Sequence, residues 1–227
     1  MPARMIEFPS NGSRAPGHLS VPPAGPGPGV VVIQEWWGLV DHITSVADRL
    51  AGAGFTALAP DLYHGRVVGL REPDEAGKAA MALDMGRAAR DLCGAVDHLV
   101  SSEEARGGLV GVIGFCMGGG LAVQLATLRE AVAACVDYYG IPGADAELAR
   151  IRGHVLGHFA EQDQHASPAA AADLGRRLDT AGVVHQFHTY PGTQHAFFND
   201  DREEVYDEGA ARQSWERTLT FLRDRLG

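Results

Sequence analysis

The 227-residue sequence predicts an α/β protein with a mostly parallel sheet covered on both faces by helices. Two features of the sequence lead to this prediction. Short apolar runs alternate along the chain with longer segments whose apolar residues recur at helical spacing. Short runs such as VVVI have no polar alternation, which is typical of parallel strands buried on both faces. Because no linker or internal repeat interrupts the alternation, we expect one domain over residues 1–227.

Each expected element follows from a local pattern. Residues 1–28 should form short extended pieces separated by turns, because SNGS and the run PPAGPGPG contain the residues that favour turns. Apolar runs predict strands over residues 29–35, 55–59, 109–114, 132–139, 155–159 and 184–190. Apolar residues at helical spacing predict helices over residues 42–53, 75–99, 116–129, 168–181 and 208–226. In the 75–99 helix, Met81 and Met85 should fill the core.

The composition argues against several classes of partner. There are 19 Lys and Arg residues against 29 Asp and Glu residues, and the net charge of −10 opposes binding to nucleic acid or to an anionic membrane. No stretch is long and apolar enough to span a bilayer, and residues 1–10 lack the apolar run of a secretory signal. We therefore expect a cytoplasmic protein that acts on a small molecule. The sequence leaves the oligomeric state open, and a monomer is compatible with it.

The spacing of cysteine and histidine predicts neither a disulfide framework nor a metal site. Cys93, Cys116 and Cys135 are widely separated and form no CxxC pair. Two close histidine pairs occur, His154 with His158 and His185 with His188. Both pairs fall in expected strands without an acidic residue at ligand spacing. We expect no metal and no organic cofactor.

The stretch GVIGFCMGGG, residues 111–120, places a thiol among glycines. A flexible loop is one interpretation, and a phosphate-binding turn is another, although the glycine spacing does not match G-x-G-x-x-G. A strand-to-helix turn that presents Cys116 as a nucleophile fits better. Gly114 and Gly118 flank it at two residues on either side, where a Cβ atom would clash in a tight elbow. The start of the following helix would favour a thiolate and bind an oxyanion. A buried structural cysteine is the alternative, and it suits Cys93 and Cys135.

A cysteine nucleophile needs a base and a group that orients the base. In α/β-hydrolases these follow the nucleophile in the order acid and then histidine, each on a loop after a later strand. Asp163 follows the expected strand 155–159, and His195 follows the expected strand 184–190. Glu161 is a rival for the role of the acid, and either carboxylate could instead cap a helix or lie solvated in a turn. The matching order favours Asp163 with His195.

Taken together, the segments GVVVIQEWWGL, PDLYHGR, GFCMGGG, VDYYG and TQHAFFND resemble the dienelactone hydrolase, or carboxymethylenebutenolidase, family. The resemblance covers nearly the whole chain, and the combination of GFCMGGG with QEWWGL is fairly specific. It implies an α/β-hydrolase fold and a catalytic triad of Cys116, Asp163 and His195. Most relatives of this fold use serine as the nucleophile, so a cysteine at this position makes the resemblance to this family more specific.

The resemblance also implies roles for other residues. Glu35, in QEWWGL, aligns with a glutamate that takes the thiol proton, although a strand-end carboxylate paired with a base is the alternative. The backbone N–H groups of Trp36 and Met117 would form the oxyanion hole. Tyr138, the first tyrosine in VDYYG, aligns with a tyrosine of the site, and a buried core tyrosine is the competing interpretation.

The expected substrate contacts depart from the family pattern in one respect. Members of the family carry an arginine four residues after the histidine, which holds the substrate carboxylate, whereas this sequence has Asn199. Arg71 is a candidate for a second arginine. The reaction type should survive this change, but dienelactone itself is not the expected substrate. The remaining lining of the site is expected from Trp36, Trp37, Phe197 and Phe198.

The sequence therefore predicts a hydrolase that opens a lactone or carboxylic ester through an acyl-cysteine intermediate. A thioesterase or another acyl hydrolase is an alternative with the same triad. A non-catalytic binder that keeps the fold is a second alternative, and the matching order of the triad residues argues against it.

Overall fold

The computed structural model describes residues 3–10 and 12–227 and divides into two compact units, Met1–Gly111 and Val112–Gly227. Asn11, in the predicted SNGS turn, lies outside the described residues, as do Met1 and Pro2. The expectation of one domain over residues 1–227 stays a prediction, and each unit is described here by itself.

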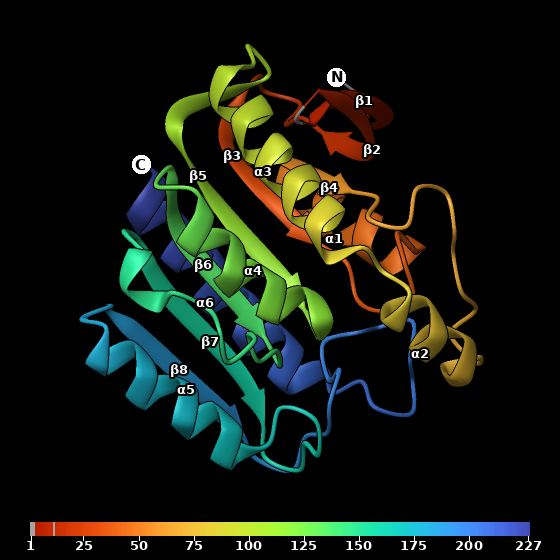
Figure 1. Ribbon diagram of the computed structural model, residues 1–227, viewed down its shortest axis with the longest axis vertical. Coiled ribbons are helices and arrows are strands. Elements are labelled where there is room, and N and C mark those ends of the chain that lie inside the picture. Colours follow the sequence, from red (N-terminus) through yellow and green to blue (C-terminus); the bar gives the residue numbers. More distant parts are fainter. Residues whose placement is uncertain (1–2, 11) are drawn as a thin grey trace. The chain divides into compact units, whose positions relative to one another are not determined.

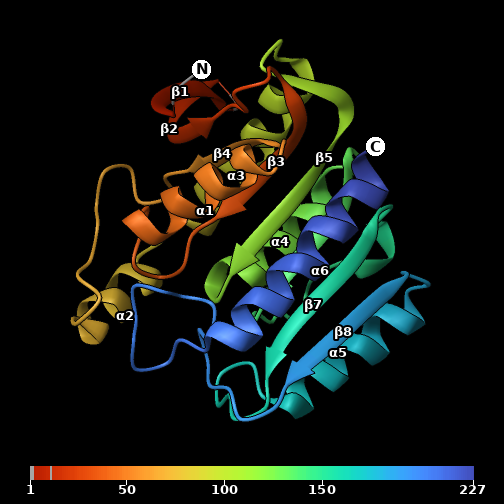
Figure 2. The ribbon, with the colours of Figure 1, turned by 180° about the vertical axis from the view of Figure 1, so that it is seen from behind.

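The first unit contains a mixed sheet with the strand order β1 (Arg4–Ser10), β2 (Ser13–Ser20), β4 (Thr56–Pro60) and β3 (Gly27–Ile33). The pairs β1–β2 and β2–β4 are antiparallel, whereas β3 and β4 are parallel. Every residue of β3 and β4 is buried, as expected for apolar runs without polar alternation. Two helices, α1 (Asp41–Gly52) and α3 (Met85–Ser101), lie on opposite faces of this sheet (Figures 1 and 2).

The prediction of one helix in the first unit is wrong. The single helix predicted over 75–99 is two helices, α2 (Pro73–Met81) and α3. The break arises because the side chain of Asp84 accepts a hydrogen bond from the N–H of Arg87 at 2.9 Å, which caps a new helix. The core role expected for the two methionines is also wrong, since Met81 is 90% exposed and Met85 is 53% exposed.

The second unit has the strand order β5-β6-β7-β8. Its first strand, β5 (Ala105–Phe115), begins in the residues of the first unit and continues into the second. The later strands are β6 (Val132–Tyr138), β7 (His154–Ala160) and β8 (His185–Tyr190). The strands β6, β7 and β8 are parallel, with Tyr138 opposite His158 and Ala160 opposite Tyr190. α4 (Met117–Leu128) and α5 (Pro168–Thr180) cover one face, and α6 (Glu208–Leu226) covers the other (Figures 1 and 2). A short 3-10 helix, Leu148–Arg150, precedes β7.

This topology places the candidate site. The carboxyl ends of parallel strands meet at one edge of a sheet, and ligands of α/β proteins bind beyond that edge. In the second unit the loops after β5, β7 and β8 carry Cys116, Asp163 and His195, in that order. The remaining expected helices and strands agree with the structure to within a few residues, except that β5 begins earlier, at Ala105.

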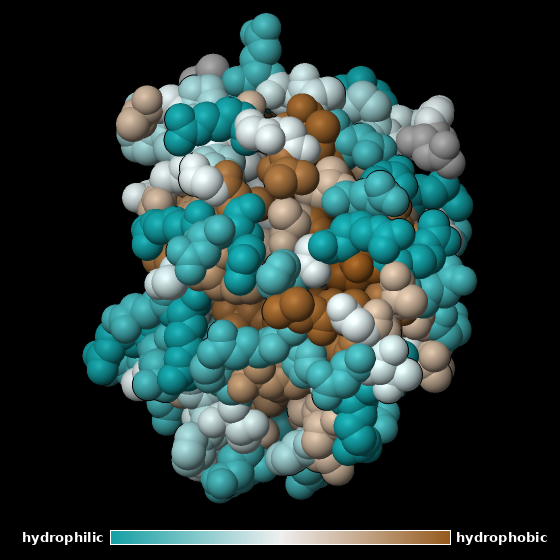
Figure 3. Space-filling model, turned by 90° about the vertical axis from the view of Figure 1, so that its left-hand side faces the viewer, coloured by the Kyte–Doolittle hydropathy of each residue, from teal (hydrophilic) through white to brown (hydrophobic). Residues whose placement is uncertain are grey.

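The surface is mainly polar on the face drawn in Figure 3, where hydrophilic residues cover most of the area and hydrophobic ones gather near the middle. Within residues 3–10 and 12–227, every helix is too short or too polar to cross a membrane.

Candidate active site

Cys116 occupies a strained turn between β5 and α4. Its backbone has φ 56° and ψ −119°, a conformation that costs energy for a residue with a side chain and is found mainly at functional sites. A backbone hydrogen bond to the neighbouring strand holds the turn in place, because the N–H of Cys116 donates to the carbonyl of Tyr138, at the end of β6, at 2.9 Å. The predicted strand-to-helix elbow is therefore present, with Cys116 at its apex and partly exposed.

The glycines around Cys116 are required by close backbone contacts. A Cβ atom at Gly114 would overlap the backbone carbonyl of Gly118. A Cβ atom at Gly119 would overlap the carboxyl group of Asp137 and the carbonyl oxygen of Tyr138. The glycine-rich run thus lets β5, α4 and the end of β6 approach closely enough to hold the elbow.

Met117 is the first residue of α4 and supplies a backbone donor beside the thiol. The first N–H groups of a helix have no acceptor within the helix, so the N–H of Met117 can bind an oxyanion. In an oxyanion hole of this kind, the residue after the nucleophile supplies such a backbone donor.

Asp163 is buried in the loop after β7, and its two carboxylate oxygens have separate tasks. One accepts hydrogen bonds from the N–H groups of His165 and Ala166, at 2.7 and 2.9 Å. The other lies 2.7 Å from Nδ1 of His195. Because Nδ1 donates to this carboxylate, the other ring nitrogen of His195 is left for its hydrogen bond with Cys116. The structure therefore brings the three residues together in one hydrogen-bonded array.

The rival acid has a different task. Glu161 is exposed, and its carboxylate accepts a hydrogen bond from the N–H of Gly192 at 2.8 Å. This contact joins the loop after β7 to the loop that carries His195, whereas the imidazole itself is bound by Asp163.

The charges of the array stabilise one another. Burial disfavours a charged His195, but its hydrogen bonds with Asp163 and Cys116 and the charges of those two groups outweigh burial and raise the pKa of His195 to about 10. Burial also disfavours an ionised Asp163, but the hydrogen bond and charge of His195 and two backbone N–H groups lower the pKa of Asp163. The carboxylate of Asp163 therefore lies beside an imidazole ring that is held in its protonated, imidazolium form.

The raised pKa of His195 predicts how this ring titrates. We expect its Cε1–H resonance to show no transition between about pH 6 and 9 and to titrate near pH 10. Because the folded pKa is raised, the stabilising contribution is complete below the ordinary histidine pKa of about 6.5 and is lost as the pH rises through 10. Cys116 is one of the groups that raise the pKa of His195, so this pKa should fall in Cys116→Ser. NMR titration checks this, with His154 as the control because burial lowers its pKa. Titration of His195 near pH 6.5 in the wild-type protein would contradict the raised pKa.

Two aromatic residues that the sequence analysis did not single out lie against the imidazole. The rings of Tyr139 and His165 each have their centroid 5.1 Å from that of His195. Tyr139 has a positive φ of 44°, and its N–H donates to the carbonyl of His158 at 2.8 Å. The usable signals were the second tyrosine of VDYYG and the position of His165 two residues after Asp163. Both residues extend the site around the base.

Several expected substrate contacts of the second unit are buried. Tyr138 has no exposed surface, and its hydroxyl lies 3.0 Å from Oγ1 of Thr218 in α6, as expected for a core tyrosine. Asn199 is also fully buried, and its side-chain oxygen accepts a hydrogen bond from the N–H of Asp201 at 3.1 Å. Phe197 and Phe198 lie within the same aromatic core as Tyr138. The structure therefore offers no accessible surface of these four residues to a substrate.

The other expected residues belong to the first unit. Glu35 lies just beyond β3 and is only 1% exposed. Trp36 is partly exposed, and its carbonyl accepts a hydrogen bond from the hydroxyl of Tyr63 at 2.9 Å, a contact that the sequence analysis missed. Trp37 is buried, and Arg71 is exposed in the loop before α2.

Among residues 3–10 and 12–227, no three His, Cys, Asp or Glu side chains are grouped so that they could hold a metal ion.

Comparison with known proteins gives a consistent picture. A sequence model described as "Dienelactone hydrolase family" matches residues 16–226. "Protein usf" of Aquifex pyrophilus is 36% identical over 235 residues, which cover 98% of this chain and 99% of that protein. The crystal structure of a dienelactone hydrolase-like promiscuous phosphotriesterase from metagenomic libraries is 26% identical, with a TM-score of 0.86 over 99% of this chain and 98% of that one.

A more distant structure supports the fold alone. A dienelactone hydrolase of Anabaena variabilis is 21% identical, with a TM-score of 0.73 over 99% of this chain and 98% of that one. The α/β fold predicted from the sequence, with its mostly parallel sheet, is confirmed by these structures.

Proposed function

Since the chain belongs to the dienelactone hydrolase family, we propose that it hydrolyses lactones or carboxylic esters through an acyl-cysteine intermediate. One observation carries this proposal, namely the hydrogen-bonded array of Asp163, His195 and Cys116 beneath a strained elbow. A nucleophile, a base and an oriented carboxylate are the groups that acyl transfer through a covalent intermediate requires.

In the first half-reaction, the thiolate of Cys116 attacks the carbonyl carbon of the substrate and a C–S bond forms. The carbonyl π-electrons move to oxygen, and the resulting oxyanion is held by the N–H of Met117 and, by the family resemblance, the N–H of Trp36. When the C–O bond breaks, the imidazolium of His195 gives its proton to the leaving alkoxide. The result is an acyl-cysteine, a neutral His195 and an alcohol, which stays tethered if the substrate was a lactone.

In the second half-reaction, neutral His195 takes a proton from water while that water attacks the thioester carbon. The C–S bond breaks, Cys116 leaves as a thiolate, and the carboxylic acid product loses its proton to the solvent. The imidazolium–thiolate pair is thereby restored, and Asp163 keeps the ring in one orientation throughout.

The resemblance offers Glu35 as the acceptor of the thiol proton. Because His195 has a raised pKa and a hydrogen bond with Cys116, we propose His195 as the acceptor of that proton, with Glu35 as the alternative. The asparagine at position 199 supports neutral esters and lactones as substrates, because a buried, uncharged amide offers no cation to a substrate carboxylate. A thioesterase remains the second candidate, since the same array would cleave a C–S bond.

The test is to trap the acyl-enzyme. After brief reaction with p-nitrophenyl acetate and an acid quench, the intact mass should rise by one acetyl group, and peptide mapping should place that group on Cys116. Parallel assays with a lactone, an aryl ester and an acyl thioester then rank the three classes by kcat/KM. A label on another residue would contradict the mechanism, and absence of turnover with every class would support a non-catalytic binder.

A further inference from the structure

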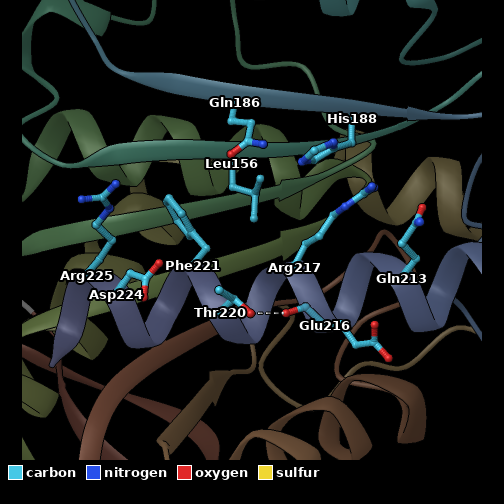
Figure 4. Close-up of a pocket in the computed structure, with 10 residues that line it drawn as sticks. All are labelled: Leu156, Gln186, His188, Gln213, Glu216, Arg217, Thr220, Phe221, Asp224 and Arg225. Atoms are coloured by element: carbon cyan, nitrogen blue, oxygen red, sulfur yellow. Dashed lines mark hydrogen bonds between the residues drawn. The ribbon is translucent and has the colours of Figure 1, made fainter.

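A groove away from Cys116 lies in the second unit, between α6 and the strands β7 and β8 (Figure 4). Its volume is about 420 Å³, which is within the range of small-molecule sites. Residues on α6 line one wall at a spacing of three or four, so they share one helical face. The lining residues are Leu156, Gln186, His188, Gln213, Glu216, Arg217, Thr220, Phe221, Asp224 and Arg225.

Arg217 is the unusual group in this groove, because its half-buried charge has no ionic partner. One N–H of its guanidinium donates to the hydroxyl of Tyr190 at 3.0 Å, and the guanidinium carbon lies 5.5 Å from that ring. Within the described part of the chain, no carboxylate lies within ion-pair distance of Arg217. A guanidinium has five N–H donors, so most of them are unused. Partly buried charges are normally paired, and an anion from solution would provide the missing partner.

The acidic residues of the groove do not supply that partner. Glu216 and Asp224 are exposed, and neither forms an ion pair with Arg217. Figure 4 shows the carboxylate of Glu216 directed away from β8, whereas the side chain of Arg217 rises toward His188. At the other end of the groove, Arg225 lies over the ring of Phe221, at 6.0 Å from its centroid.

The charge of Arg217 affects the pKa of the neighbouring His188. It extends from β8 toward Arg217 (Figure 4), and burial, together with the charge of Arg217, lowers the pKa of His188. The fully buried His158 stacks on it with ring centroids 5.9 Å apart, and burial, together with the charges of His188 and Arg217, lowers the pKa of His158 well below its ordinary value. The groove therefore has cationic arginines and a neutral histidine that can donate or accept a hydrogen bond.

We propose that this groove binds a small organic carboxylate, with the carboxylate at Arg217 and the apolar part over Leu156 and Phe221. The amide of Gln186 and the ring of His188 lie on the opposite wall, where they can complete the hydrogen bonds of the carboxylate. The apolar side chains between the two arginines distinguish this class from inorganic anions, which would leave that surface uncovered.

The titration of His188 provides a local test of binding with octanoate as the probe. A carboxylate at Arg217 would offset the charge that suppresses protonation, so saturating octanoate should raise the pKa of His188 in an NMR titration. In Arg217→Gln, affinity should fall about tenfold or more, because a charge-assisted hydrogen bond is lost. Arg217→Lys keeps the charge and should retain part of the binding. Arg223→Gln is the matched control, since Arg223 is an exposed arginine of α6 outside the groove.

Neutral octanamide and inorganic phosphate serve as comparison compounds in the same titration. Both should bind at least tenfold more weakly than octanoate, the first for lack of charge and the second for lack of an apolar part. The proposal is overturned if octanoate leaves His188 unchanged up to about 10 mM, if Arg217→Gln binds as tightly as wild type, or if either comparison compound matches octanoate. The measurement involves no hydrolysis, so its failure would leave the proposed function untouched.

Discussion

We expect Cys116→Ala to lower kcat/KM for an aryl ester by about 10⁴–10⁶-fold, because no acyl-enzyme can form without the thiolate. The small remaining rate would come from binding and from the N–H groups that hold the oxyanion. The folded structure should be retained, since alanine is smaller than cysteine and the elbow is held by the backbone bond to Tyr138. Steady-state kinetics and a thermal melt on the same preparation measure both effects.

Cys93→Ala is the matched control for this result. Cys93 lies in α3 and is buried, so its loss should reduce stability by about 1 kcal/mol and leave the turnover of the folded enzyme within a few-fold of wild type. If Cys116→Ala retained a substantial fraction of activity, cysteine would not be the nucleophile and the mechanism would have to be abandoned.

We expect Asp163→Asn to lower kcat by about 10³–10⁴-fold with little loss of stability. The amide oxygen can still accept the N–H groups of His165 and Ala166, which keeps the loop in place. An amide carries no negative charge, so the ring of His195 loses its orienting acceptor and much of the stabilisation of its imidazolium form. The pKa of His195 should fall together with kcat, and NMR titration with steady-state kinetics would show both changes.

Glu161→Gln is the control that separates the two candidate acids. Glu161 is exposed and bound to the N–H of Gly192, so its amide should retain nearly wild-type turnover. Loss of activity in Glu161→Gln with retention in Asp163→Asn would reverse the assignment of the acid.

Local patterns in the sequence were sufficient for much of the fold. The fully buried residues of β3 and β4 follow from runs without polar alternation, and the close contact of Gly114 with Gly118 explains why a glycine-rich segment predicts an elbow. The chain order of Cys116, Asp163 and His195 also predicted their convergence, because parallel strands present their carboxyl ends at one edge. Such features depend on residues close together in the chain and on the order of the strands, and both can be inferred from the sequence.

The tertiary structure decided what depends on the direction of side chains and on distant partners. Periodicity could not show that Asp84 caps a separate helix, since the apolar pattern continues across the break. The sequence favoured Asp163 but could not exclude Glu161, because both follow the same strand and only their hydrogen bonds differ. Asn199 and Tyr138 matched site positions by motif, but both are fully buried, and the hydroxyl of Tyr138 lies against Thr218 of the remote helix α6. The sequence by itself therefore determined which residues could react, and packing determined which of them are accessible, paired and charged.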